Sequence, residues 1–437
     1  MPLYRRLHSH RQRHSRGADA AMQSRRLPAG AVPWHGVRMN RAVWIIVAAG
    51  GTILTIGLGV RQSFGLFLAP MSVDLGFGRE LFGLAMGIAN LMWGLASPFA
   101  GAVADRFGVA RTVLAGAVLY TLGVAWMANA GSGADVIGAS ALTGLGIAAA
   151  GFTTILGAVG RAAPPEKRSI ALGIVAAGGS VGQFLIVPVG HALLTGYGWA
   201  GALWGLAIVS AAMIPLARGL AGAPTFAAQP GAQSAREALR EAFRHRSFWL
   251  LTAGFFVCGF HVVFVATHLP AFLADRGLPG WVAAWSLAIV GIFNIIGTWI
   301  AGQLGQTKPK KSLLAALYAL RSLVFLVFIL APLTPASTLA FAAGLGLLWL
   351  STVPLTSGLV ATFFGPTYMA MLYGIVFFSH QIGSFLGAWL GGVAYDVLGS
   401  YDAMWWISVA LGLASAAIHL PIAERPVARL MVAGARA

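Results

Sequence analysis

The sequence from residue 101 to residue 111 reads Gly101-Ala-Val-Ala-Asp105-Arg106-Phe-Gly108-Val-Ala-Arg111 and separates two long apolar segments, 80–103 and 110–130. Each segment is long enough to cross a bilayer core about 30 Å thick as a helix. Charged side chains are costly within that core, so we expect this stretch in a turn at the membrane surface. The two segments would then be consecutive membrane spans joined by a short charged loop.

The rest of the chain is also rich in apolar residues and poor in charged ones. Of the 437 residues, 58% are hydrophobic and 9% are charged, whereas soluble domains are about 25% charged. Apolar runs of roughly 20 residues, the length of a helical span, predict an all-α polytopic membrane protein with twelve transmembrane helices. The expected spans are 42–68, 80–103, 110–130, 134–158, 169–195, 199–217, 248–272, 281–303, 312–331, 337–361, 369–394 and 402–421.

The positions of the basic residues predict the orientation of these spans. Of the 29 Lys and Arg residues, Arg79 and Arg276 lie in odd-numbered loops, and Arg61 and Arg321 lie within spans. All the others fall in the terminal segments and the even-numbered loops, so the positive-inside rule predicts a multi-pass protein of the cytoplasmic (inner) membrane with both termini in the cytoplasm. Because the net charge of +17 is spread between spans and not over one folded face, we expect no nucleic-acid partner.

The longest connection between spans divides them into two groups of six. It contains Arg236-Glu237-Ala-Leu-Arg240-Glu241-Ala-Phe-Arg244, whose i,i+3 pairs of opposite charge suit a surface helix. Two related halves are typical of transporters that bind their substrate at the midplane between the halves. We expect a six-helix bundle at 39–217, a cytoplasmic linker at 218–247, a second six-helix bundle at 248–421 and a cytoplasmic tail at 422–437.

The first 38 residues have a different character. They are rich in Arg and His and contain no apolar run, so they resemble neither a signal peptide nor a span. We expect a basic, disordered extension at 1–38, and Met22 and Met39 are alternative translation starts.

The charged loop also carries a family signature. Its pattern resembles the G-x-x-x-D-R-x-G-R motif between helices 2 and 3 of the major facilitator superfamily, carried here by Gly101, Asp105, Arg106 and Gly108, with the last basic residue displaced to Arg111. The resemblance implies the major facilitator fold, twelve helices in two pseudo-symmetric halves. In that family the Asp is thought to dock on the N-terminus of helix 11 as a conformational latch. Asp105 would then dock at the span that begins near Met369.

Arg61 is the most unusual residue of the first span, because no carboxylate shares that span. A buried guanidinium keeps its charge and needs a counter-charge or strong acceptors. We interpret Arg61 as the residue that binds the carboxylate of an anionic ligand. The alternative is that backbone carbonyls of neighbouring helices hold it in a structural role.

A narrower resemblance involves the first and eighth spans. The stretches Gly59-Val-Arg61-Gln62-Ser63-Phe-Gly-Leu-Phe67 and Gly291-Ile-Phe-Asn294-Ile-Ile-Gly297-Thr298 are similar to helices 1 and 8 of the monocarboxylate and oxalate/formate transporter branch. Helix 8 there commonly has Asp or Asn followed four residues later by a substrate-binding Arg, which Thr298 replaces here. Oxalate-type members use a Lys in helix 11, where this chain has His380-Gln381. The resemblance implies a substrate site built from Arg61, Asn294, Thr298, His380 and Gln381.

A few other polar residues lie within spans but belong to no family motif. Gln183, near the centre of the fifth span, is a further candidate for the substrate site. His261, His268 and His380 are the mid-membrane groups that titrate near neutrality, so they are the candidates for proton coupling. No acid or i,i+4 histidine pair accompanies them, and Cys258 is the only cysteine, so we expect no metal site and no disulfide. We expect Arg321 to bond helix-end or neighbouring carbonyls.

Together these features predict a secondary active transporter of a small organic anion, in the first instance a monocarboxylate, that works by rocking of its two halves. We expect a monomer surrounded by lipid, with protons as a candidate coupling ion and no cofactor. The chain has no nucleophile elbow, Walker loop or paired carboxylate, so we do not expect an enzyme. The alternatives are a cation or drug efflux transporter of the same fold, which usually needs an embedded carboxylate, and a non-transporting membrane sensor, which would need a partner domain in its loops.

Overall fold

The computed structural model describes residues 39–164, 167–222, 234–365 and 368–430. The extension at 1–38, for which we expected disorder, lies outside the described residues, as do residues 223–233 of the predicted linker and 431–437 of the predicted tail. Every regular element in the described part is helical, and the helices belong to a unit that begins at Arg41.

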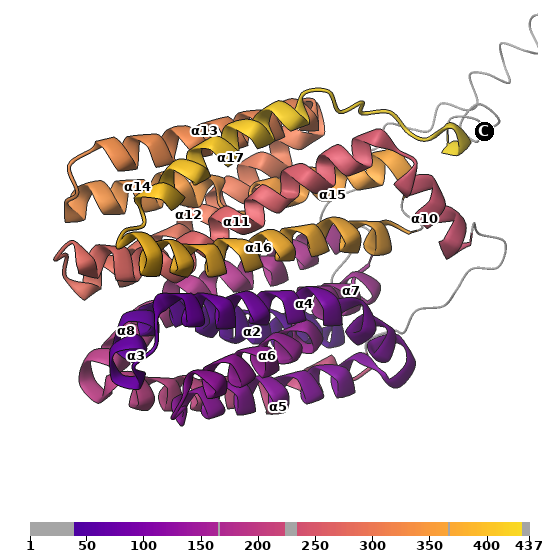
Figure 1. Ribbon diagram of the computed structural model, residues 1–437. Coiled ribbons are helices and arrows are strands. Elements are labelled where there is room, and N and C mark those ends of the chain that lie inside the picture. The colour runs from indigo at the N-terminus through magenta and orange to yellow at the C-terminus, as the bar shows by residue number, and fades with distance from the viewer. Residues whose placement is uncertain (1–38, 165–166, 223–233, 366–367, 431–437) are drawn as a thin grey trace, which may run out of the picture. The chain divides into compact units, whose positions relative to one another are not determined.

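The first half of the chain contains six crossings of the helical unit (Figure 1). The first crossing runs through α2 (Arg41–Ser63), the short 3-10 helix η1 (Phe64–Phe67) and α3 (Leu68–Leu75). The next crossings are α4 (Arg79–Phe107), α5 (Val109–Ala128), the pair α6 (Gly133–Ala150) and α7 (Phe152–Ala162), and then α8 (Arg168–Ala211), which is followed by α9 (Met213–Leu216) and η2 (Ala217–Leu220).

The second half repeats this arrangement after the linker helix α10 (Ala235–Phe243). Its helices are α11 (Arg246–Asp275), α12 (Gly280–Thr307), α13 (Lys310–Leu330), the pair α14 (Pro335–Leu348) and α15 (Thr352–Phe364), α16 (Met369–Leu398) and α17 (Asp402–His419). Ser234 begins α10 with a capping box, in which Ser234 and Glu237 exchange side-chain to backbone hydrogen bonds. The backbone N–H of Ser234 lowers the pKa of the Glu237 carboxyl because it favours the charged form.

The twelve predicted spans are confirmed. Ten helical stretches in the described part are long and apolar enough to cross a membrane. One of them, Ile170–Leu220, has 51 residues, about twice what one span needs. Gly198, near its middle, adopts the left-handed backbone conformation (φ 70°) that ends one crossing and starts the next. With α17 as the last crossing, the count is twelve.

Two of the crossings are broken, which the sequence analysis did not predict. The fourth is interrupted at Gly151, between α6 and α7, and the tenth at residues 349–351, between α14 and α15. These crossings occupy equivalent positions in the two halves. Broken helices within a membrane are tolerated where the freed backbone is buried in protein or lines a cavity, and paired breaks are a feature of transporter sites.

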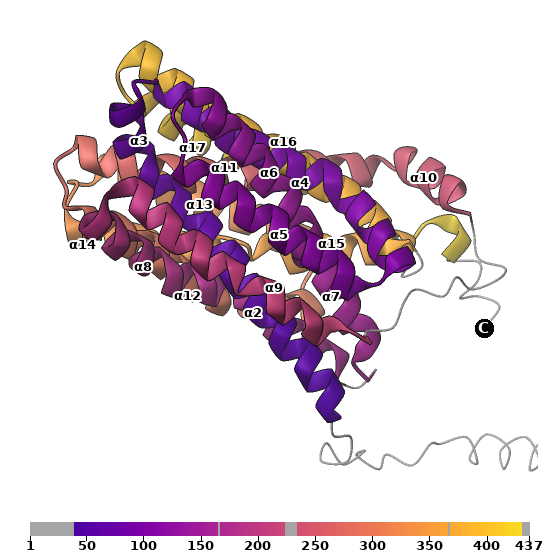
Figure 2. The same ribbon diagram turned by 90° about the horizontal axis from the view of Figure 1, so that it is seen from below.

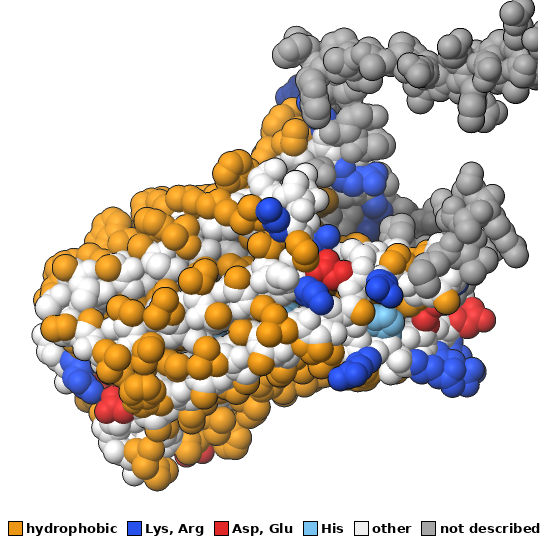
Figure 3. Space-filling model, turned by 90° about the horizontal axis from the view of Figure 1, so that it is seen from above, with side chains coloured by type: hydrophobic (Ala, Val, Ile, Leu, Met, Phe, Trp, Pro, Cys, Tyr) orange, Lys and Arg blue, Asp and Glu red, His pale blue; other side chains and the backbone are white. Residues whose placement is uncertain are grey.

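The two halves meet mainly along two pairs of helices, α4 with α16 and α8 with α12 (Figure 2), and α11 also contacts η1 and α3 of the first crossing. Glycines permit the close approach: Gly83 faces the Ala388 carbonyl, and a Cβ on Gly291 would lie 2.7 Å from the Ser180 carbonyl oxygen. On the outside, hydrophobic side chains cover the flanks of the helices while charged ones gather towards the ends (Figure 3). This distribution is that of a protein whose flanks contact lipid.

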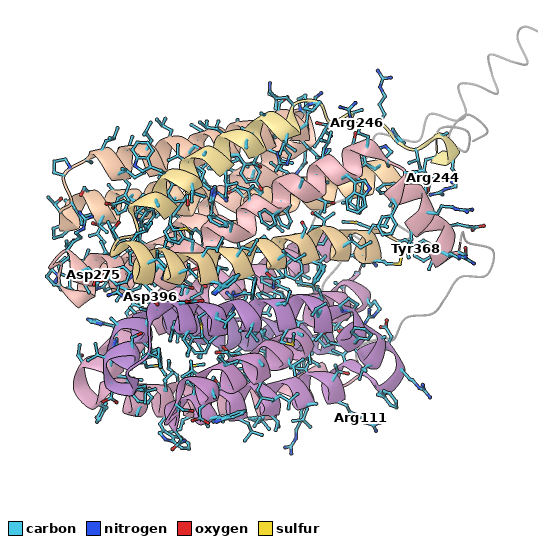
Figure 4. All side chains as sticks on the ribbon, viewed as in Figure 1. Arg111, Arg244, Arg246, Asp275, Tyr368 and Asp396 are labelled. Carbon is cyan, nitrogen blue, oxygen red and sulfur yellow. The ribbon has the colours of Figure 1, made fainter. Side chains whose placement is uncertain are left out.

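The charged residues define two ends of the bundles. Asp275 and Asp396 lie at one end, and Arg111, Arg244 and Arg246 at the other (Figure 4). We call the first the Arg79 end, because Arg79 bonds both Asp275 and Asp396, and the second the Arg111 end.

Candidate functional site

Arg61 lies near the end of α2 and reaches across to α4. Its Nη2 donates to Oδ1 of Asn90, and its Nη1 donates to Oε1 of Gln62 at 3.3 Å. The guanidinium also lies over the Trp93 ring, 5.1 Å from the centroid. Asn90 and Trp93 are three residues apart on α4 and share one face of that helix. The hydrogen-bond partners of Arg61 are therefore neutral side-chain amides and not backbone carbonyls.

A small cavity adjoins this arginine. It has a volume of about 30 Å³ and is lined by Arg61, Asn90, Tyr120 of α5, Thr143 of α6 and residues of α11, among others. Such a volume holds a water molecule, not a carboxylate with several heavy atoms. None of the ion pairs among the described residues includes Arg61. In this conformation the guanidinium is thus partly buried and forms no ion pair with the described part of the chain.

Asn294 and Gln183 lie on the seam between α8 and α12. Asn294 Nδ2 donates to Ser180 Oγ at 2.8 Å, and its Oδ1 accepts from the Leu350 N–H at 2.9 Å and from Thr298 Oγ1 at 3.2 Å. Gln183 Nε2 donates to the Leu287 carbonyl at 2.8 Å. In this conformation Asn294 and Gln183 tie the halves together, Asn294 also holds the break in the tenth crossing, and Thr298 supports Asn294 from the same helix. None of them lines the Arg61 cavity.

His380 and Gln381 lie on α16, across the seam from α4. His380 Nδ1 contacts Gln381 Oε1 at 3.1 Å, and a Cβ on Gly94 of α4 would lie 2.9 Å from the Gln381 Cβ. The His380 ring stacks on Phe377 with centroids 5.7 Å apart, and Phe377 packs edge-on against Trp93 at 5.5 Å. Two aromatic rings therefore connect Arg61 with His380. The Nε2 atoms of His380 and Gln381 are buried and have no hydrogen-bond partner among the described residues.

His261 and His268 are both buried in the second half. His261 Nε2 contacts the Ser408 carbonyl of α17 at 2.9 Å, and its ring packs edge-on against Phe325 at 5.0 Å. His268 contacts the Ala388 carbonyl at 2.6 Å and the Tyr401 hydroxyl at 3.3 Å. The residues of α11 that face the Arg61 cavity are Val263, Ala266 and Thr267. The structure therefore does not bring these two histidines to Arg61.

The loop motif lies at the Arg111 end. Asp105 forms an ion pair with Arg161 of α7 at 3.6 Å, within the same half. Gly108 has φ 93°, which a side chain rarely permits, and it separates α4 from α5. Arg106 lies over the Phe107 ring, Gly101 has open space where a side chain would be, and Arg111 lies in the first turn of α5. We expected Asp105 to contact the start of α16. Among the described residues, the ion pair that it forms is with Arg161 and not with a residue of α16.

Arg79 makes contacts between the two halves that the sequence analysis did not predict. It forms two parallel hydrogen bonds with Asp275, at 2.5 and 2.6 Å, donates to Tyr401 at 3.0 Å and lies 3.6 Å from the Tyr395 ring centroid. These contacts join the start of α4 to the end of α11 and the α16–α17 region. The sequence offered one indication that Arg79 is unusual: it is one of only two basic residues in the odd-numbered loops.

Arg321 is fully buried in α13 and bonds carbonyls, as expected. Its Nη2 donates to the Leu348 carbonyl and, at 2.8 Å, to the Trp349 carbonyl. Both carbonyls belong to the break between α14 and α15. Arg321 thus donates to backbone carbonyls at this break, and Asn294 accepts from a backbone N–H at the same break.

Comparison with known proteins places this architecture in a family. Residues 43–388 match the model of the Major Facilitator Superfamily. Monocarboxylate transporter 13 of Bos taurus is 27% identical over 87% of this chain and 89% of its own length. The uncharacterized MFS-type transporter YcxA of Bacillus subtilis (strain 168) is 25% identical over 80% of this chain and 88% of its own.

Solved structures agree in fold. A D-xylose-proton symporter superposes with a TM-score of 0.68 at 16% identity, covering 87% of this chain and 97% of its own. A bacterial homolog of the human lysosomal transporter Spinster, in an inward-facing and unoccupied conformation, superposes with a TM-score of 0.66 at 16% identity. The superposition covers 89% of this chain and 95% of that structure's chain. With the family model matched over most of its length and twelve helices in two halves, the chain belongs to the major facilitator superfamily.

Proposed function

We propose that this protein is a secondary active transporter of a small organic anion, a monocarboxylate in the first instance. The family supports transport, and several relatives that match most of the chain bear the name monocarboxylate transporter. The observation that carries the proposal is Arg61, a partly buried guanidinium beside a cavity lined by residues of both halves, whose hydrogen-bond partners are neutral amides. A carboxylate can offer two acceptor oxygens to such a group, which an amide cannot.

Arg61 is the proposed anchor of the carboxylate. We expect the substrate to replace Asn90 as a partner of the guanidinium, because Asn90 now accepts from Nη2, one of the atoms that a carboxylate bound through two parallel hydrogen bonds would use. His380 and Gln381 are proposed to complete the site from the second half, since each has a buried Nε2 atom without a partner. Asn294, Thr298 and Gln183 engage the substrate only in a conformation in which the seam between α8 and α12 opens.

The transport cycle is proposed to be a rocking motion of the bundles 39–217 and 248–421 in the cytoplasmic membrane. The linker 218–247, the tail 422–437 and the Arg111 end would then face the cytoplasm, in keeping with the positive-inside rule. Among the candidates for proton coupling, His380 is favoured over His261 and His268 because it connects to Arg61 through Trp93 and Phe377. Proton symport and anion exchange are both compatible with this site.

The alternative within the same fold, export of a cation or drug, has less support. A cation would meet the positive charge of Arg61, and among the described residues no Asp or Glu lines the cavity beside it. Such a ligand would therefore be repelled at this point of the path.

The direct test is uptake of a panel of radiolabelled carboxylates into proteoliposomes, with and without a pH gradient. Arg61→Lys keeps the charge but loses the two parallel hydrogen bonds, so the apparent affinity should fall at least tenfold. Arg61→Gln should nearly abolish binding while the protein still inserts. Arg276→Gln is the matched control, since Arg276 lies at the Arg79 end and pairs with Asp402 within its own half. Wild-type uptake by a well-expressed Arg61→Gln protein would refute the proposal.

A further inference from the structure

The break in the fourth crossing exposes a helix start that no side chain caps. The helix α7 has eleven residues and begins after Gly151, whose backbone (φ −101°, ψ −161°) departs from the helix. Because Gly151 has no side chain, no cap hydrogen bond is made at this terminus. The first backbone N–H groups of a helix have no partner within it, and they carry its partial positive charge. This terminus lies inside the bundle and not at a membrane surface, since α6 and α7 together form one crossing.

Two further polar groups at this break lack partners. A Cβ on Gly151 would lie 3.6 Å from Nε1 of Trp93, and that indole N–H is buried without an acceptor. The Trp93 side chain is more than nine-tenths buried. Thr154, in the first turn of α7, has a buried hydroxyl that is also unpartnered. An indole N–H and backbone N–H groups can only donate hydrogen bonds, so the set favours an acceptor that bears negative charge.

At the equivalent break in the second half, side chains bond the freed backbone groups. There, Arg321 donates to the carbonyls of Leu348 and Trp349, and Asn294 accepts from the N–H of Leu350. The protein's own side chains thus satisfy the break between α14 and α15. At the break between α6 and α7 the described hydrogen bond is the helical one from Ile155 N–H to the Gly151 carbonyl. The two breaks share a position in the fold, but in the first no side chain among the described residues bonds the freed backbone groups.

We propose that the first turn of α7, Gly151–Thr154, together with the indole N–H of Trp93, is a second binding site for a small singly charged oxyanion. Its ligand is the carboxylate group of the transported substrate, and in this respect the inference rests on the proposed function. Trp93 links the two sites, because Arg61 lies over the face of the ring while Nε1 lies near Gly151. A carboxylate released by Arg61 would be received by α7, which lies nearer to the Arg111 end.

The site can be tested without transport by fluorine NMR. The purified protein is labelled with 5-fluorotryptophan, and the Trp93 resonance is assigned as the one missing from Trp93→Phe. Sodium acetate is then titrated into the Arg61→Gln protein, so that binding at Arg61, which lies over the Trp93 ring, does not contribute to the shift. The ionic strength is held constant with a bulky sulfonate buffer. We expect a saturable shift of the Trp93 resonance. The Trp126 resonance, assigned with Trp126→Phe, should not move, because its Nε1 already donates to Asp135 at 3.2 Å. A Trp93 resonance that stays still, or that drifts linearly without saturation, would overturn the inference.

Affinity measurements separate this site from the transport function. In the wild type, the affinity for the best carboxylate of the uptake panel is compared with that of Trp93→Phe and Thr154→Val. We expect Trp93→Phe to weaken it about tenfold, as loss of one hydrogen bond to a charged group does, and Trp126→Phe to leave it unchanged. If Arg61→Gln stops uptake while acetate leaves the Trp93 resonance unmoved, the α7 site is refuted and the transport function stands. If acetate moves the resonance but no carboxylate is taken up, the anion site stands and the proposed function fails.

Discussion

The carboxylate of Asp396, in the last turn of α16, caps the start of α4 by accepting the backbone N–H of Glu80 at 2.8 Å and that of Arg79 at 3.0 Å. The residue before them, Gly78, has no side chain with which to cap the helix, and the Asp396 carboxylate occupies the space where one would be. A negative charge at a helix N-terminus is stabilising. One half of the protein therefore caps a helix of the other.

This contact is the counterpart of the one expected for Asp105. Asp105 lies at the end of α4 and was predicted to dock at the start of α16, whereas Asp396 lies at the end of α16 and docks at the start of α4. In this conformation the Arg79 end is closed by Asp396, and Asp105 pairs with Arg161 of its own half. We interpret the α4–α16 pair as carrying a latch at each end, engaged in alternate conformations.

Asp396→Asn should therefore loosen the Arg79 end. The substitution keeps the shape and removes the charge, at an expected cost of about 1 kcal/mol to the closed state. Spin labels at Val73→Cys and Val397→Cys, both exposed at this end in opposite halves, in a Cys258→Ser background should report a longer distance component. Asp402→Asn is the control, because Asp402 pairs with Arg276 within one half. Equal distance distributions with and without the Asp396→Asn substitution would argue against the latch.

The ion pair between Arg79 and Asp275 should contribute to the same closed state. Its two short hydrogen bonds and the Tyr395 ring suit a planar guanidinium, so Arg79→Lys should cost about 2 kcal/mol of closure although the charge is kept. A double-mutant cycle with Asp275→Asn, read by the same spin labels, gives the coupling energy. If the two substitutions act additively, Arg79 closes this end through other partners.

How far the sequence predicted this structure depends on the kind of feature. The spans follow from runs of apolar residues, and their observed ends differ from the predicted ones by a few residues, as for 80–103 against α4. The break at Gly151 was missed because a single glycine does not stand out in a chain with 57 of them. The break at residues 349–351 contains no glycine or proline, and it exists because Arg321 and Asn294 satisfy its backbone from distant helices.

Pairings between distant residues could not be read from the sequence. Arg79, Asp275 and Asp396 each lie near the end of a span, and only the folded chain brings them together. Likewise, Asn294 was assigned to the substrate site by its place in a motif, and the sequence did not predict that its amide bonds Ser180 of the other half and the backbone of Leu350 in this conformation. The sequence did predict that no acid shares the span of Arg61, because this depends only on which residues that span contains.

The orientation of the protein can be checked with two single-cysteine variants. In a Cys258→Ser background, Arg236→Cys lies on the linker helix α10 and Arg276→Cys lies at the Arg79 end. By the positive-inside rule, a membrane-impermeant maleimide should label only Arg276→Cys in intact cells, and both variants in lysed cells. Labelling of Arg236→Cys from outside would reverse the assignment of the two ends.

Proton coupling, if present, should depend on His380 more than on His268. Both nitrogens of His268 have partners, whereas His380 Nε2 has none in the described part of the chain. His380→Gln should abolish uptake driven by a pH gradient while counterflow exchange continues, because exchange needs no net proton movement. His268→Gln, the control, should retain gradient-driven uptake. Coupled uptake by the His380→Gln protein would remove this residue from the mechanism.

The relation between Arg61 and Asn90 gives the sharpest test of the anion site. Asn90 Oδ1 accepts from Arg61, and its Nδ2 donates to the Met86 carbonyl at 2.7 Å, so the amide is held in place by its own helix. Asn90→Asp would put a carboxylate beside the guanidinium, and the substrate would then have to displace an internal anion of the same kind. We expect the dissociation constant of the carboxylate to rise at least tenfold, since a charged hydrogen bond is about twice as strong as a neutral one. Asn90→Ala removes the competitor and should leave the affinity equal or higher. Asn129→Asp, at an exposed helix end, controls for the added charge. Because Asn90→Asp and Asn90→Ala are expected to act in opposite directions, a general loss of packing cannot imitate the result, and equal weakening by both would mean that Arg61 does not bind the substrate.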